Sequence, residues 1–287
     1  MAGASFGLRP LLARGKPLVF PWMGIPGAEL AAQVARAGFE AVAIDLQHST
    51  IDMGDAAKMT NAINAVGVPV ILRVRWNDPG IIGAALDMGA AAVIAPMTNS
   101  VAQVEALVKA AKYPPVGQRS WGGYTMLQAA GVTAGEYLKE ANSQTLVFAM
   151  IETQEALDNL DAIAAVPGLD GLFVGPSDLS IALSNGAGID RLGAHTHVSG
   201  GKPRHVARGG HEQVGVRAQV LLAANERADG HLCPARIQHR RVLRARPDAC
   251  ARPWEQAVRQ PGAQQTCFTV VHIPSRLIAA DIGALRS

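Results

Sequence analysis

Residues 68–97 read VPVILRVRWNDPGIIGAALDMGAAAVIAPM and contain a complete strand–helix–strand pattern. The two ends, VPVILRV and AAVIAPM, are short runs rich in Val, Ile and Ala, typical of strands buried on both faces. Between them, Pro79 stands in the first turn of an expected helix and Gly89 just after its last turn, the usual start and stop signals. This stretch therefore predicts a β-strand, an α-helix and a second, parallel strand.

The same alternation extends from residue 17 to residue 175. Strand-like runs recur, separated by helix-like stretches: PLVFPW, AVAIDLQH, VPVILRV, AAVIAPM, TLVFAMIE and GLFVG. Repeated βα units build a parallel sheet, either open and doubly wound or closed as a (β/α)8 TIM barrel. No GxGxxG or GxxxxGKS/T motif follows these runs, which weakens a nucleotide-binding interpretation. We therefore expect an α/β protein of the (β/α)8 barrel class.

Composition indicates a globular protein. The chain has 287 residues, of which 49% are hydrophobic and 17% charged, enough to bury a full core. No apolar run reaches the roughly 18 residues that span a bilayer. The start, MAGASFGLRPLLARGKPLVF, lacks the continuous apolar region and cleavage site of a signal peptide. These features predict a cytoplasmic location and no membrane partner.

Ionisable residues stand where four of the strand-like runs end. They are Asp45 and His48, then Arg73, Arg75 and Asp78, then Glu152, and finally Asp178. In a (β/α)8 barrel the carboxyl ends of the strands meet on one face, and the chemistry lies there. Each residue alone has an ordinary structural role open to it: Asp178 as a helix cap, His48 as a hydrogen-bonded loop residue, Arg73 in an internal ion pair. Together they predict a functional site.

Two carboxylates on neighbouring strands suit a divalent metal ion. Glu152 and Asp178 have no Cys and no second His near them in the sequence, which favours a hard cation such as Mg²⁺ or Mn²⁺. An arginine and a histidine beside such an ion would stabilise a developing enolate and move a proton. This combination predicts enolate chemistry on a 2-oxo acid.

One irregular stretch interrupts the alternation. Residues 112–133 read KYPPVGQRSWGGYTMLQAAGVT and bring Pro, Gly and aromatic residues where a strand would be expected. A loop of this length in a compact domain is usually an active-site lid or a binding loop, and the alternative is a surface excursion.

Several segments, in this order, resemble a known enzyme family. DLQHS, LRVRWNDPGIIGAALDMGAAAVIAPM, YPPVGQRSWGG and IETQEALDNLDAIAAVPGLDGLFVGPSDLSIALS are similar to sequences of the HpcH/HpaI family. These are metal-dependent class II pyruvate aldolases that include 4-hydroxy-2-oxoheptanedioate aldolase. The resemblance covers residues 15–190 and implies a barrel, a homo-oligomer that is a hexamer in the family, and a small-molecule substrate. The implied reaction cleaves 4-hydroxy-2-oxo acids to pyruvate and an aldehyde through a metal-bound enolate.

The resemblance also implies which residues bind the metal and the substrate. Glu152 and Asp178 would ligate a divalent cation, Mg²⁺, Mn²⁺ or Co²⁺, and Ser177 and Asp178 would contact the substrate. Some members have a substrate-contacting Gln two positions before the glutamate, where this chain has Met150.

Three further residues receive catalytic roles from the resemblance. His48 would be the acid/base residue, Arg73 would stabilise the pyruvate enolate, and Asp87 would raise the basicity of His48. Two other functions stay open: a citrate-lyase-β-like acyl-CoA lyase, and an inactive protein that only binds 2-oxo acids.

The last third of the chain differs in kind from the rest. Residues 1–190 hold 11 Lys and Arg against 17 Asp and Glu, whereas residues 191–287 hold 15 against 6. The resemblance stops near residue 190, and an Arg-rich composition without a period is typical of out-of-frame translation of a GC-rich gene. We therefore expect an aldolase barrel portion, 1–190, and an anomalous, out-of-frame basic segment of low order, 191–287. On this hypothesis strands seven and eight are missing or disordered.

The alternatives for the basic segment are a nucleic-acid-binding tail and a Cys/His metal module. Cys233, Cys250 and Cys267 lie 17 residues apart, with no CxxC spacing, which disfavours a zinc site. The basic run lacks interleaved aromatic residues and any recognised motif, so we expect no nucleic-acid partner.

Overall fold

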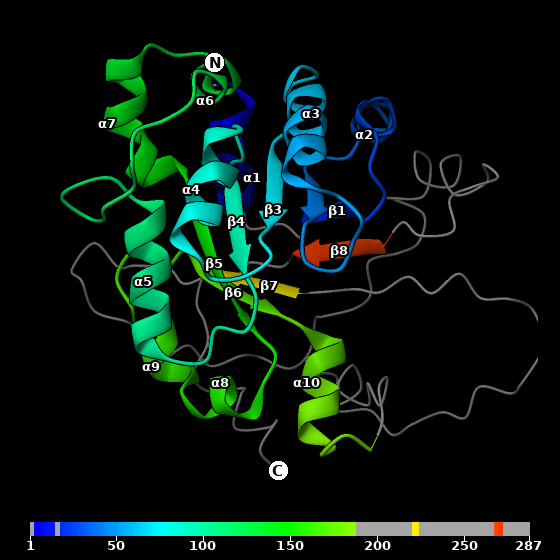
Figure 1. Cartoon of the computed structure of the whole chain (residues 1–287), viewed down its shortest axis with the longest axis vertical. Helices are drawn as coiled ribbons and strands as arrows, with labels where there is room; N and C mark the ends of the chain where they lie inside the picture. The colour runs from blue at the N-terminus through cyan, green and yellow to red at the C-terminus, as the bar shows by residue number, and fades with distance from the viewer. Residues whose placement is uncertain (1–2, 15–17, 188–219, 224–266, 272–287) are drawn as a thin grey trace, which may run out of the picture.

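A computed structural model of the chain describes residues 3–14, 18–187, 220–223 and 267–271. Strands and helices alternate through the second of these ranges (Figure 1). The first six strands are β1 (Leu18–Met23), β2 (Val42–Asp45), β3 (Val70–Arg73), β4 (Ala92–Ala95), β5 (Leu146–Ile151) and β6 (Gly171–Val174). Each strand overlaps one of the six strand-like runs, so those predictions are confirmed.

Helices fill the connections between the strands. They are α2 (Ala28–Arg36), α3 (Met53–Asn64), α4 (Pro79–Asp87), α5 (Val101–Ala111), α6 (Thr125–Ala130), α7 (Ala134–Gln144), α8 (Gln154–Asp158), α9 (Leu160–Ala164) and α10 (Pro176–Leu183), with η1 (Ala4–Phe6) and α1 (Leu8–Ala13) before β1. Polar caps begin several of them: Asp52 caps α3, Asp78 caps α4, and Ser100 forms a capping box with Gln103 on α5. Asp78 is therefore a helix cap. Among the described helices, none combines the length and apolar character needed to cross a membrane.

The sheet closes into a barrel, but its last two strands are unusual. Strands β1 to β6 pair in chain order and run parallel. β7 (Val220–Ala223) and β8 (Cys267–Val271) complete the closed barrel. β7 runs antiparallel to β6 and β8 antiparallel to β1 (yellow and orange-red in Figure 1). The barrel expectation thus holds for six parallel strands. The prediction that strands seven and eight are missing is not confirmed, and the rest of residues 191–287 lies outside the described residues.

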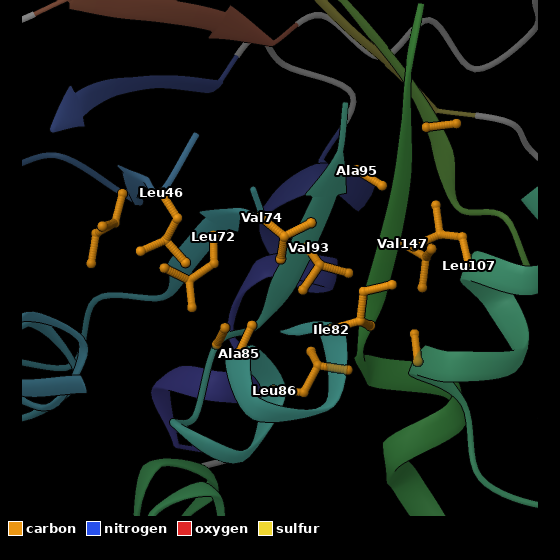
Figure 2. Packing of buried hydrophobic residues seen from close by; sticks show 14 of the residues in the cluster. Leu46, Leu72, Val74, Ile82, Ala85, Leu86, Val93, Ala95, Leu107 and Val147 are labelled. Carbon is orange, nitrogen blue, oxygen red and sulfur yellow. The ribbon is translucent and has the colours of Figure 1, made fainter. Parts of the chain in front are cut away.

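Apolar residues on alternate positions of β1 to β6 build two separate cores. One lies between the sheet and the surrounding helices, where Leu72 and Val93 of the strands meet Ile82 and Leu86 of α4 (Figure 2). The other fills the barrel interior and contains Phe20, Ile71, Phe148 and Phe173, among others. Because side chains alternate along a strand, the residue two positions after an interior residue also points into the interior.

This alternation puts polar residues inside the carboxyl end of the barrel. Arg73 follows the interior residue Ile71 by two positions, and Glu152 follows Met150 in the same way. Both polar residues are buried, with 6% and 2% exposed. The predicted site at the strand ends is thus built into the fold.

Residues 112–133 lie at the other end. They connect α5 through α6 to α7, which leads into β5. Since helices of βα units return to the amino ends of the strands, this segment lies on the face opposite the strand carboxyl ends. Figure 1 shows the arrowheads of β3 and β4 pointing away from α6. The segment therefore forms no lid over the chain's own strand ends, because it follows a helix and not a strand, and the binding-loop alternative stays a prediction.

Candidate active site

Arg73 and Asp45 form a buried ion pair at the carboxyl ends of β3 and β2. The two residues are partners in the strand register. Arg73 Nε donates to Asp45 Oδ1 at 2.8 Å, and a second guanidinium N–H donates to Oδ2. Trp22 Nε1 also donates to Oδ2, at 3.3 Å, and the Trp22 ring centroid lies 4.9 Å from the guanidinium carbon. The internal ion pair considered for Arg73 is thus present, and it fixes the guanidinium inside the barrel.

Asp45 also organises the loop that carries His48. Burial alone would raise the pKa of Asp45, but the Arg73 guanidinium and two backbone donors outweigh it and hold this pKa below its usual value. The donors are the backbone N–H groups of Gln47, at 2.9 Å, and His48, at 3.3 Å. His48 itself is exposed to solvent. The sequence places Asp45 at the end of a strand and assigns it no role. The buried Arg73 on the next strand needs an anionic partner, and this need is the signal that points to Asp45.

Glu152, directly after β5, is a second buried carboxylate of the site. Its Oε1 accepts a hydrogen bond from the backbone N–H of Met97 at 2.6 Å. Burial raises the pKa of Glu152, and the negative charge of Asp178 raises it further, while the Met97 N–H and the charge of Arg73 act in the opposite direction. Arg73 and Asp178 are therefore both within electrostatic reach of Glu152.

Asp178 and Ser177 lie just beyond β6. Helix α10 begins after Gly175, and no side chain caps it. Asp178 is in its first turn and exposed, so it is not a helix cap. Ser177 is half-buried, and its carbonyl oxygen accepts a hydrogen bond from the Ser180 hydroxyl at 2.7 Å. The structure thus places three predicted residues, Arg73, Glu152 and Asp178, near one another.

Asp87 lies elsewhere. It is the last residue of α4, which begins at the carboxyl end of β3 and returns to the amino ends of the strands. There Arg119 donates to Asp87 Oδ1 at 2.8 Å, and burial raises the pKa of Asp87 despite this arginine. A direct contact of Asp87 with His48 is therefore not made within one chain, and the role of Asp87 in raising the basicity of His48 stays a prediction.

Two carboxylates are available to hold a cation. Within the described part of the chain, no group of three or more His, Cys, Asp and Glu side chains could hold a metal ion. On the resemblance, Glu152 and Asp178 would be the two protein ligands, and the remaining positions would be left to water and substrate. The charge of Asp178 disfavours ionisation of the buried Glu152, a repulsion that a cation between them would remove. Carboxylate oxygens are the ligands that hard divalent cations prefer, so these two side chains are the ones that would hold such a cation.

Several known proteins with related sequences are named as aldolases. A family model described as HpcH/HpaI aldolase/citrate lyase matches residues 21–225. The chain is 41% identical over 176 residues to a hydroxypyruvate/pyruvate aldolase of Rhizorhabdus wittichii, covering 61% of this chain and 69% of the relative. It is 36% identical over 169 residues to a 4-hydroxy-2-oxo-heptane-1,7-dioate aldolase of Salmonella arizonae, covering 59% of this chain and 64% of the relative. The matched part of the chain thus spans 69% and 64% of the length of these two curated relatives.

A solved structure superposes on much of the chain. An HpcH/HpaI aldolase/citrate lyase family protein from Burkholderia cenocepacia superposes with a TM-score of 0.59 at 30% identity. The superposition covers 67% of this chain and 77% of that chain.

Proposed function

The chain belongs to the HpcH/HpaI aldolase/citrate lyase family and is by descent an aldehyde-lyase; we propose that it cleaves 4-hydroxy-2-oxo acids to pyruvate and an aldehyde with the help of a divalent cation. The observation that carries this proposal is the grouping of Arg73, Glu152 and Asp178 at the carboxyl ends of β3, β5 and β6. A cation site beside a fixed guanidinium suits a reaction in which negative charge develops on a 2-oxo group.

The chain's own residues divide the chemical work. His48 removes the proton of the substrate 4-hydroxyl, so that the C3–C4 bond breaks and the aldehyde leaves. The guanidinium of Arg73, held in place by Asp45, stabilises the enolate until protonation at C3 gives pyruvate. Glu152 and Asp178 would hold the divalent cation, which when bound supplies Lewis-acid polarisation of the 2-oxo group.

Pyruvate release from a 4-hydroxy-2-oxo acid, followed with a coupled lactate dehydrogenase assay, tests the proposal. We expect EDTA to abolish release and Mg²⁺ or Mn²⁺ to restore it. Glu152→Gln should lower the rate by about 100-fold or more, because a ligand is lost. Glu155→Gln, at an exposed position in the first turn of α8, is the matched control and should leave the rate unchanged. Activity that ignores the chelator would refute the metal role, and a requirement for an acyl-CoA would favour the acyl-CoA lyase instead.

We also propose that the active protein is a homo-oligomer in which Asp87 comes from a neighbouring copy. Within one chain Asp87 and His48 lie at opposite ends of the barrel. The Asp87 side chain keeps 29% of its surface exposed. Trp121 and Tyr124, in the segment packed beside it, are 48% and 86% exposed. A carboxylate on such a surface can contact a second copy, which would reconcile its place in the fold with the role that the resemblance implies.

Mixing two inactive variants tests this arrangement. His48→Ala and Asp87→Ala are each expected to lose activity, because each lacks one half of the pair. Their mixture, after dissociation and reassembly, should recover up to about one quarter of the activity, since some sites then combine two intact halves. Lack of recovery in a mixture that size-exclusion chromatography shows to be oligomeric would contradict the shared site.

A further inference from the structure

Glu152 lies in a slot whose two sides are made by backbone. On one side the backbone N–H of Met97, just after β4, donates to Glu152 Oε1 at 2.6 Å. On the other side is Gly175, just after β6, where an added Cβ atom would lie 2.5 Å from Glu152 Oε2. Both β4 and β6 are neighbours of β5, the strand that precedes Glu152. One carboxylate oxygen thus accepts a hydrogen bond from Met97, and the other faces Gly175.

Met97 has a backbone conformation that residues with side chains rarely adopt. Its φ is 51°, in the left-handed region that only Asn185 shares among the described non-glycine residues. The buried hydroxyl of Thr98 donates to the carbonyl oxygen of Ala95 at 3.1 Å, which holds the turn around Met97. This turn aims the Met97 N–H at Glu152.

Gly175 serves the same carboxylate by having no side chain. Its φ of −93° is one that any residue adopts, so the backbone itself does not require glycine. A Cβ atom here would lie 2.5 Å from Glu152 Oε2 and 2.8 Å from Met150 Cε, too close for either to stay in place. Even alanine would displace the Glu152 carboxylate.

We propose that Met97 and Gly175 are positioning residues for metal binding. The Met97 N–H occupies Oε1 of Glu152, so that Oε2 is presented to the cation. Oε2 lies on the β6 side, where Asp178 follows. This inference rests on the proposed function, because the cation is the one assigned to that site. A carboxylate that is already oriented loses less freedom when it binds an ion, and such outer partners raise metal affinity. The left-handed backbone of Met97, and not its side chain, carries the effect.

Mn²⁺ affinity, measured by isothermal titration calorimetry on the full chain, tests the inference. Gly and Asn adopt a positive φ readily, whereas Val, with its branched Cβ, does not. We expect Met97→Gly and Met97→Asn to bind Mn²⁺ within about threefold of the unmodified protein, and Met97→Val and Gly175→Ala to bind it about 10- to 100-fold more weakly. Thermal unfolding of each variant shows whether it is folded, and the Mn²⁺ electron paramagnetic resonance spectrum reports its ligand geometry.

The outcomes separate this inference from the proposed function. Equal Mn²⁺ affinity of Met97→Val and Met97→Gly would overturn the inference while leaving the metal site intact. If Met97→Val does not fold, the comparison of Met97→Asn with Met97→Ala decides: both shorten the side chain, and the inference requires the asparagine variant to bind more tightly. Failure of the unmodified protein to bind Mn²⁺ would refute the proposed metal site, and the inference with it.

Discussion

At the scale of single residues, the sequence shows which groups need partners but not which partners they have. Arg73 in an apolar strand requires an anion, because an unpaired guanidinium is costly to bury. Choosing Asp45 requires the register of β2 against β3, which side-chain alternation alone does not fix. Met97 gives no signal in the sequence, because it acts through its backbone N–H and its φ.

Removing Asp45 should destabilise the protein strongly. In Asp45→Ala the Arg73 guanidinium stays buried without a counter-charge, and we expect the free energy of unfolding to fall by about 3–5 kcal/mol. The double variant Asp45→Leu/Arg73→Met removes both charges and should recover most of that loss. Urea denaturation measures both, with the exposed Asp158→Asn as control. A loss no larger in Asp45→Ala than in this control would mean that the pair is not buried as described.

At the scale of elements, local signals predict strands and helix starts well, and connections less well. Caps such as Asp52 and Ser100 act within a few residues, so the sequence contains the whole signal. A lid over the chain's own strand ends is expected from residues 112–133 only because the segment is long and irregular. The end of the barrel at which a loop lies depends on whether the loop follows a strand or a helix. The irregular stretch gives no sign that helix α6 forms within it.

Lys112, just after α5, joins three elements at the amino end of the barrel. Its ammonium group donates to the carbonyl oxygen of Asn142 at 2.9 Å and to Asp170 Oδ2 at 3.2 Å. Asp170 also accepts from the backbone N–H of Val147, at 2.9 Å, and pairs with Arg9. Burial lowers the pKa of Lys112, and Arg9 adds to this effect, although the charge of Asp170 opposes it.

This lowered pKa predicts a stability that rises with pH. Between the folded pKa of Lys112 and its ordinary value of about 10.4, the unfolded chain binds more protons than the folded one, so the free energy of unfolding increases with pH. Lys112→Met should lose that part of the slope, whereas Lys109→Met, at an exposed lysine in the last turn of α5, should keep it. Urea denaturation from pH 7.5 to 10 compares the three proteins. The same slope in Lys112→Met as in the unmodified chain would contradict the prediction.

At the scale of the whole molecule, the six parallel strands follow from a repeated pattern, and the closure does not. A (β/α)8 barrel closes with parallel strands joined by helices. Here β7 pairs antiparallel with β6, and β8 pairs antiparallel with β1. The two strands, VLLA and CFTVV, come from the basic segment 191–287, where short apolar runs do not repeat in a βα pattern.

We propose that residues 191–287 are read out of frame, and the gene sequence decides the matter. A frame disruption is expected between codons 185 and 240, and restoring the frame should replace β7 and β8 with strands parallel to β6 and β1. Parallel closure would pair both edges of the sheet along their full length and seal the core, so the restored protein should unfold at a higher temperature and release pyruvate faster. Differential scanning calorimetry and the pyruvate assay compare the two forms. An intact reading frame through these codons would refute the proposal and make the antiparallel closure a native feature of this barrel.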